Sequence, residues 1–129
     1  NVFTWTPSYS TAGRNEIKNV DTVFAVGDGR LASKQIAKIP VEDKNRAPKI
    51  VDATKSINAK ANKHVLMFVK AVDDDGDELT YMWNFGFLDK YKATANHQRT
   101  FTSKGTKIIK VIVSDGIDET VQVINVNVV

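Results

Sequence analysis

Apolar and polar residues alternate with a period of two in several stretches of the chain, and this pattern most constrains its fold. In residues 109–114 the side chains of Ile109, Val111 and Val113 share one face of a predicted strand, and Asp115-Gly116 ends that strand as a turn. Further strands are predicted at 64–71, 79–85, 98–102 and 120–129. Because no segment has an apolar stripe of helical period, we expect almost no helix and an antiparallel β-sandwich.

An internal repeat follows from the same pattern. Residues 28–41 align with residues 115–128 without a gap, beginning at Asp28-Gly29 and Asp115-Gly116. In both copies the apolar alternation changes parity near its end, which predicts a β-bulge at one shared place. The sequence therefore contains two copies of one hairpin.

The two copies have unequal surroundings, and this difference sets the predicted domain boundaries. Few residues precede the first hairpin, whereas the long stretch before the second holds further strands. A charged segment containing Pro48 lies between them. We therefore expect a partial β unit at 1–43, a linker at 44–48 and a complete β-sandwich at 49–129.

Composition excludes several classes of protein. Hydrophobic residues make up 42% and charged residues 26%, which is typical of a folded globular domain. The net charge of +3 is spread along the chain, so no nucleic-acid partner is expected. No apolar run is long enough for direct membrane insertion, and no signal peptide is visible. The absence of cysteine excludes disulfides and thiolate sites.

Residues 48–129 resemble the polycystic-kidney-disease-type (PKD-like) domain, an immunoglobulin-like β-sandwich of surface proteins and secreted hydrolases. The resemblance is carried by four spaced elements: Asp73-Asp74-Asp75-Gly76-Asp77; Leu79-Thr80-Tyr81-Met82-Trp83-Asn84-Phe85-Gly86; Phe101 with Gly105; and Ile109-x-Val111-x-Val113-x-Asp115-Gly116. In the family, Asp-Gly usually follows the glycine that corresponds to Gly86. In this sequence Gly86 is followed by Phe87-Leu88-Asp89. We therefore expect a different loop at 87–96.

The preceding residues resemble the C-terminal half of a bacterial cadherin-like or immunoglobulin-like repeat. This similarity rests on Phe3-Thr4-Trp5-Thr6-Pro7, Ala12-Gly13, Asp28-Gly29 and Asp43-x-Asn45-Arg46-Ala47-Pro48. The two resemblances imply a non-catalytic spacer or adhesion module of a secreted or cell-surface protein. They also imply that its partners are neighbouring repeats of the same polypeptide, with protein or polysaccharide ligands.

An acidic run is the main candidate for a metal site. Calcium takes six to eight oxygen ligands, and closely spaced carboxylates can supply several. By resemblance to cadherin-like repeats, the predicted calcium ligands are Asp43, Asn45, Asp73, Asp75 and Asp77. A solvated turn that needs no metal is the alternative interpretation.

Aromatic residues divide into a core group and an exposed group. Trp83, Phe85 and Tyr81 fall on one face of a predicted strand and are expected in the core. Tyr9, Phe87 and Tyr91 are expected in loops, where aromatic rings can stack on sugars. They give the alternative function, an accessory carbohydrate-binding domain of a secreted hydrolase.

No combination of residues in the sequence suits catalysis. The serines lack a Gly-x-Ser-x-Gly elbow, and His64 and His97 lack metal-ligand spacing. We therefore expect a protein that is not an enzyme.

Overall fold

A computed structural model describes residues 2–129, and strands are the only regular elements in this range. The described residues contain no helix, so none of them forms an apolar helix that could cross a membrane. The chain divides into an N-terminal unit ending at Asn45 and a C-terminal unit, Arg46–Val129. The all-β prediction is confirmed.

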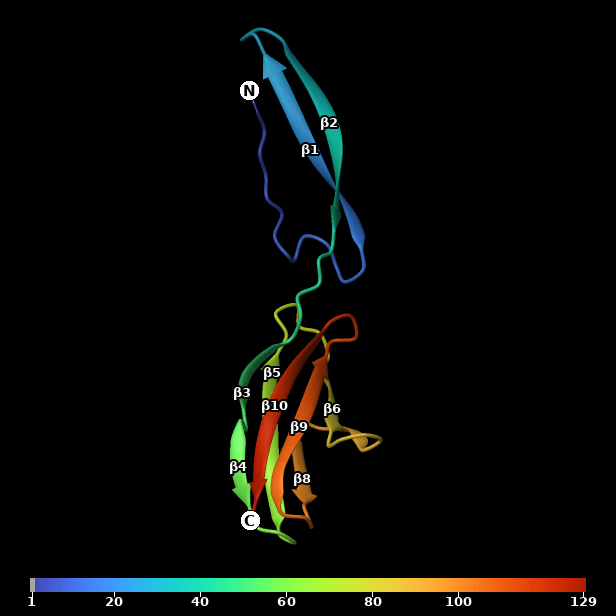
Figure 1. The fold of residues 1–129 in the computed structure, drawn as a ribbon. Coiled ribbons are helices and arrows are strands. Elements are labelled where there is room, and N and C mark those ends of the chain that lie inside the picture. Colours follow the sequence, from blue (N-terminus) through green and yellow to red (C-terminus); the bar gives the residue numbers. More distant parts are fainter. Residues whose placement is uncertain (1) are drawn as a thin grey trace. The chain divides into compact units, whose positions relative to one another are not determined.

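The N-terminal unit is built on a single two-stranded antiparallel ribbon. Strand β1 (Ile17–Gly27) pairs with β2 (Ala32–Glu42) over its whole length. The residues before β1 run beside the ribbon (Figure 1), where the Phe3 ring meets the edge of Phe24 at 5.3 Å between centroids. Most apolar side chains of this unit are exposed, because one ribbon cannot enclose them.

The C-terminal unit contains the remaining eight strands of the described residues. They are β3 (Lys49–Ala53), β4 (Ser56–Ala59), β5 (His64–Val72), β6 (Thr80–Asn84), β7 (Lys90–Ala93), β8 (Asn96–Thr100), β9 (Gly105–Ser114) and β10 (Glu119–Val128). One sheet has the order β4-β10-β9-β6-β7 and the other has the order β3-β5-β8. All pairs are antiparallel except β4 with β10. Figure 1 shows the layers of this sandwich.

Alternation places one face of each central strand in the core of the C-terminal unit. The inward residues of β5 are Val65, Met67 and Val69, which pack with those of β9 and β10: Ile109, Val111, Val113, Ile124, Val126 and Val128. Trp83 is 0% exposed between the sheets, and its Nε1 donates to the Thr94 carbonyl at 3.0 Å. The prediction that Trp83 belongs to the core is confirmed.

The hairpins β1–β2 and β9–β10 have the same register and the same turn. Phe24 pairs with Gln35 in the first hairpin, as Val111 pairs with Gln122 in the second. Gly29 and Gly116 have φ values of 91° and 92°, a left-handed conformation that glycine adopts without strain. The repeat read in the sequence is therefore also a repeat of backbone structure.

The predicted β-bulge in these hairpins is wrong. Both ladders run without a register shift, and the shift seen in the C-terminal unit lies between β3 and β5. The apolar parity changes because Ile36 and Val123 point outward, with exposures of 61% and 41%. Apolar side chains on the outer face therefore imitated a bulge in the sequence pattern.

Most predicted strands have the expected positions, with differences near chain turns. The strand expected at 98–102 begins earlier, at Asn96, and the short strands β3 and β4 lie where the sequence pattern predicted none. Strand β7, which begins at Lys90, was not expected because its sequence has little apolar alternation. It forms because it pairs with β6.

Candidate functional site

The acidic turn of residues 73–78 joins β5 to β6 and is organised by its own first carboxylate. Asp73 Oδ1 accepts the backbone N–H groups of Asp75 at 2.8 Å and Asp77 at 3.2 Å. Gly76 has a φ of 80°, which lets the chain reverse within the turn. Asp73 therefore acts first as a turn-forming residue.

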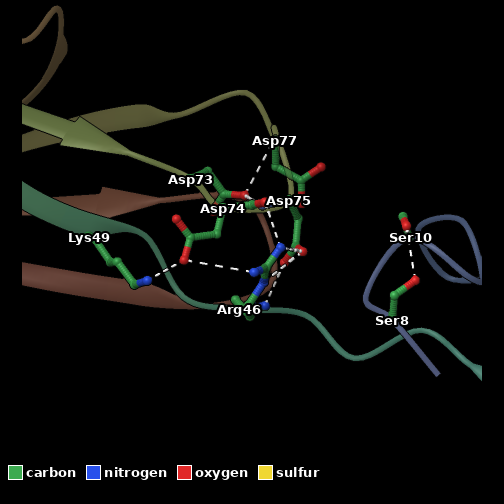
Figure 2. A network of polar contacts seen from close by, with 8 residues as sticks. All are labelled: Ser8, Ser10, Arg46, Lys49, Asp73, Asp74, Asp75 and Asp77. Atoms are coloured by element: carbon green, nitrogen blue, oxygen red, sulfur yellow. Dashed lines mark hydrogen bonds and ion pairs between the residues drawn. The ribbon is translucent and has the colours of Figure 1, made fainter. Parts of the chain in front are cut away.

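Arg46 lies against this turn and contacts its second and third aspartates, Asp74 and Asp75 (Figure 2). Its Nε and Nη2 atoms donate to Asp75 Oδ1 at 2.9 and 2.5 Å, and its backbone N–H donates to Asp75 Oδ2 at 2.8 Å. Nη2 also donates to the Asp74 carbonyl at 2.5 Å, while Lys49 Nζ pairs with the Asp74 carboxylate. Two cations thus compensate the central part of the acidic turn.

The charge pairs hold both aspartates in their ionised form. The hydrogen bond from Arg46 lowers the pKa of Asp75 below its ordinary value, and burial opposes this only in part. The hydrogen bond from Lys49 likewise lowers the pKa of Asp74. Asp74 and Asp75 therefore keep their negative charges, and the protein's own cations meet them.

The five predicted calcium ligands fall in two different units. Asp43 and Asn45 belong to the N-terminal unit, where Asp43 Oδ2 accepts the Asn15 N–H at 3.2 Å. In the C-terminal unit, Asp73 Oδ2 is buried and accepts no hydrogen bond, whereas Arg46 occupies both oxygens of Asp75. Within residues 2–129, no group of three or more His, Cys, Asp or Glu side chains is arranged to hold a metal ion. Calcium binding stays a prediction.

The three predicted ligand-binding aromatics occupy three different settings. Tyr9, 55% exposed, lines a small hollow within the N-terminal unit, and Phe87, 94% exposed, stands in the loop between β6 and β7. Tyr91 lies in β7 and not in a loop, because Lys90–Ala93 pairs with β6. Its ring stacks on His97 at 6.1 Å between centroids and contacts Phe85, so it belongs to an aromatic cluster with these two residues.

That aromatic cluster is organised around Arg99, which sequence reasoning missed. The Arg99 guanidinium lies 4.2 Å from the centre of the Phe85 ring and forms an ion pair with Asp89. Burial, followed by the nearby charge of Arg99, lowers the pKa of His97, and Asp89 opposes this shift. His97 therefore packs as a neutral aromatic ring at neutral pH.

A second hollow, here called the outer hollow, lies on the outward face of the five-stranded sheet. Its volume is about 700 Å3, and it is lined by Asn84, Gly86, Phe87, Leu88, Lys90, Ile108 and Lys110. The two lining residues from β9, Ile108 and Lys110, alternate along the strand with Ile109 and Val111, which are buried in the core. Apart from Phe87, none of the lining residues was predicted as a site residue, because the hollow depends on the neighbouring positions of β6, β7 and β9.

Comparison with known proteins places the C-terminal unit in a described family. The sequence model of the family described as "PKD domain" matches residues 45–128. No curated protein matches the chain.

Solved structures with related folds carry immunoglobulin-like modules. The tandem Ig repeats of Dlar share 17% identity at a TM-score of 0.50, covering 92% of this chain and 64% of that one. The N-terminal Ig1-2 module of the Drosophila receptor protein tyrosine phosphatase DLAR shares 14% identity at a TM-score of 0.48, covering 81% of this chain and 60% of that one. The fibronectin(III)-like modules of Clostridium thermocellum CbhA share 17% identity at a TM-score of 0.47, covering 88% and 62%.

The chain is shorter than the proteins that it matches. It spans between 20% and 64% of the length of these and two further solved structures. At these identities the similarity concerns the fold, which is immunoglobulin-like.

Proposed function

Because the chain belongs to the PKD domain family through residues 45–128, we propose that it is a non-catalytic structural and interaction module of a multi-repeat secreted or cell-surface protein. PKD domains are typically extracellular, and their fold is typical of non-catalytic domains. In this role the chain holds neighbouring domains apart and presents binding surfaces on its strands and loops. An accessory carbohydrate-binding domain is the alternative.

The observation that carries this proposal is the duplicated hairpin. Each unit contains one long hairpin with the same register and the same Asp-Gly turn. Tandem copies of one supersecondary element are the mark of repeat arrays, in which each copy contacts its neighbours in sequence. A cadherin-like origin for the first copy remains part of the proposal.

The start of the C-terminal unit supports a stiffened boundary. Thr120 Oγ1 donates to the Pro48 carbonyl at 2.6 Å, and Arg46 binds the acidic turn as described above. The backbone of residues 46–48 is thus attached to the sandwich at two points. We propose that Arg46, and not a calcium ion, stiffens this boundary.

Calcium can reach Asp75 only by displacing Arg46, since the guanidinium donates to Oδ1 and the backbone N–H donates to Oδ2. The residues of the C-terminal unit therefore do not fit a calcium ion while this pair is formed. Calorimetric titration of calcium into the intact chain and an Asp73→Ala/Asp75→Ala variant tests this directly. Saturable heat in the native sequence alone would restore calcium as the stiffening cation.

The spacer role is tested by small-angle X-ray scattering of the intact chain and an Arg46→Ala variant. Loss of the Arg46 side-chain hydrogen bonds is expected to broaden the distribution of interatomic distances, because only a backbone N–H then joins residue 46 to Asp75. Arg30→Ala is the matched control, since Arg30 is an exposed arginine in the β1–β2 turn. Identical scattering from all three proteins would contradict a stiffening role for Arg46.

A further inference from the structure

The outer hollow has the size and construction of a binding site. Its volume of about 700 Å3 lies within the range of ligand pockets in proteins. Its lining residues come from strands β6, β7 and β9 and from the β6–β7 loop. The hollow lies on the face opposite the core, so folding of the sandwich does not fill it.

The lining of the outer hollow includes large apolar side chains that folding leaves in water. Phe87 is 94% exposed, Leu88 is 86% exposed and Ile108 is 60% exposed. Leu88 also has a φ of 63°, a left-handed conformation that is unfavourable for a leucine. Contiguous exposed apolar surface beside a hollow is typical of interaction sites.

The loop that carries Phe87 and Leu88 is held in position from its base. Phe85 N–H donates to the Asp89 carbonyl at 2.9 Å, and Gly86 N–H donates to Asn84 Oδ1 at 3.0 Å. The ion pair between Asp89 and Arg99 joins the end of the loop to β8. A tethered loop loses little conformational entropy when a partner binds.

Two lysines flank the hollow symmetrically. Asn84 pairs with Lys90 of β7 on one side and with Lys110 of β9 on the other. In residues 2–129 neither lysine has an ion-pair partner. The charged groups of the lining are therefore both positive, and they favour a partner with carboxylates.

We propose that the outer hollow binds an extended protein segment in which one large apolar side chain stands beside carboxylates. The apolar side chain packs against Phe87, Leu88 and Ile108, and the carboxylates meet Lys90 and Lys110. This inference deepens the interaction part of the proposed function and rests on it. It adds a specific site and a chemical class of partner.

The lining favours a peptide over a sugar. A sugar ring presents many hydroxyl groups that need both donors and acceptors, and among the lining side chains only Asn84 offers an acceptor. Leu88 and Ile108 match an apolar side chain better than a hydroxylated ring. Strand β7 is also an edge strand of its sheet, so among the described residues it pairs only with β6. An extended segment has room beside it.

The test uses the intact chain and a fluorescein-labelled peptide, Asp-Phe-Asp-Glu, followed by anisotropy and by nitrogen-15 NMR. Binding is expected to shift the amide signals of Phe87, Leu88 and Lys110. Lys110→Glu is expected to weaken binding at least about tenfold, since an attraction becomes a repulsion. Lys70→Glu, an equal charge change at an exposed position of β5 in the other sheet, is expected to change it less than about twofold.

Three results would overturn the inference. They are equal binding of the peptide Asp-Ser-Asp-Glu, equal binding by Lys110→Glu, and no binding up to millimolar peptide. Tetragalacturonate that binds where the peptide does not would assign the hollow to an acidic glycan instead. The scattering test of Arg46 does not involve the hollow, so failure here is distinguishable from failure of the spacer proposal.

Discussion

The carboxylates of Asp28 and Asp115 make the same hydrogen bonds in two different units. Oδ1 of Asp28 accepts the N–H groups of Arg30 and Leu31 at 2.9 and 2.8 Å. Oδ1 of Asp115 accepts those of Ile117 and Asp118, both at 2.7 Å. Asp28 is exposed, whereas Asp115 is 3% exposed. One turn therefore exists in a solvated and a buried version.

Burial predicts unequal effects of one substitution at these two positions. Asp115→Ala removes a buried acceptor from the Ile117 and Asp118 N–H groups, and it is expected to lower the free energy of unfolding by about 1–3 kcal/mol. Asp28→Ala is the matched control and is expected to leave the stability of the N-terminal unit nearly unchanged, because water replaces its exposed carboxylate. Urea unfolding followed by tryptophan fluorescence measures both. Equal effects would contradict a role for burial.

The Trp83 side chain should be the most sensitive aromatic position. Trp83→Phe removes the hydrogen bond to Thr94 and opens space in the core, so we expect a loss of about 1–3 kcal/mol. Trp5→Phe is the control, because Trp5 is 43% exposed, and less than about 0.5 kcal/mol is expected. Thermal unfolding of both variants measures the two losses of stability, and equal losses would contradict the central role of Trp83.

Acidification should weaken the contact between Arg46 and Asp75. Since the folded state lowers the pKa of Asp75, this carboxylate stabilises the fold above its ordinary pKa, near 3.8, and the contribution disappears as the pH falls through the lowered value. The melting temperature of the native sequence is expected to fall across this range. Asp75→Asn should show a smaller fall, and an equal fall would contradict the assignment.

His97 should add a second pH dependence in a milder range. Because burial lowers its pKa below the ordinary value near 6.5, protonation favours the unfolded chain. Stability is therefore expected to decrease as the pH drops from about 6.5 towards the lowered pKa. His97→Gln is expected to remove this slope, as measured by thermal melting between neutral and mildly acidic pH.

The division after Asn45 predicts that residues 46–129 fold on their own. The core of the C-terminal unit contains only residues of that unit, so its melting temperature should stay within about 2 °C of that in the full chain. A large decrease would show that the N-terminal unit contributes to the stability of the sandwich. Differential scanning calorimetry of both proteins makes this comparison.

The sequence by itself determined the β fold, the duplicated hairpin and the buried position of Trp83. These features depend on local rules, since alternation and Asp-Gly turns act between residues close in the chain. The same local pattern failed where outward apolar residues such as Ile36 and Val123 imitated a bulge. Alternation cannot tell which face of a ribbon another sheet will cover.

Only the tertiary structure decided which distant side chains meet. Arg46 binds Asp75 because the turn between β5 and β6 returns to the start of the C-terminal unit. Lys90 and Lys110 flank Asn84 because β6 lies between β7 and β9 in the sheet. Sheet order and register follow from the packing of the whole core, and no short stretch of sequence contains that information.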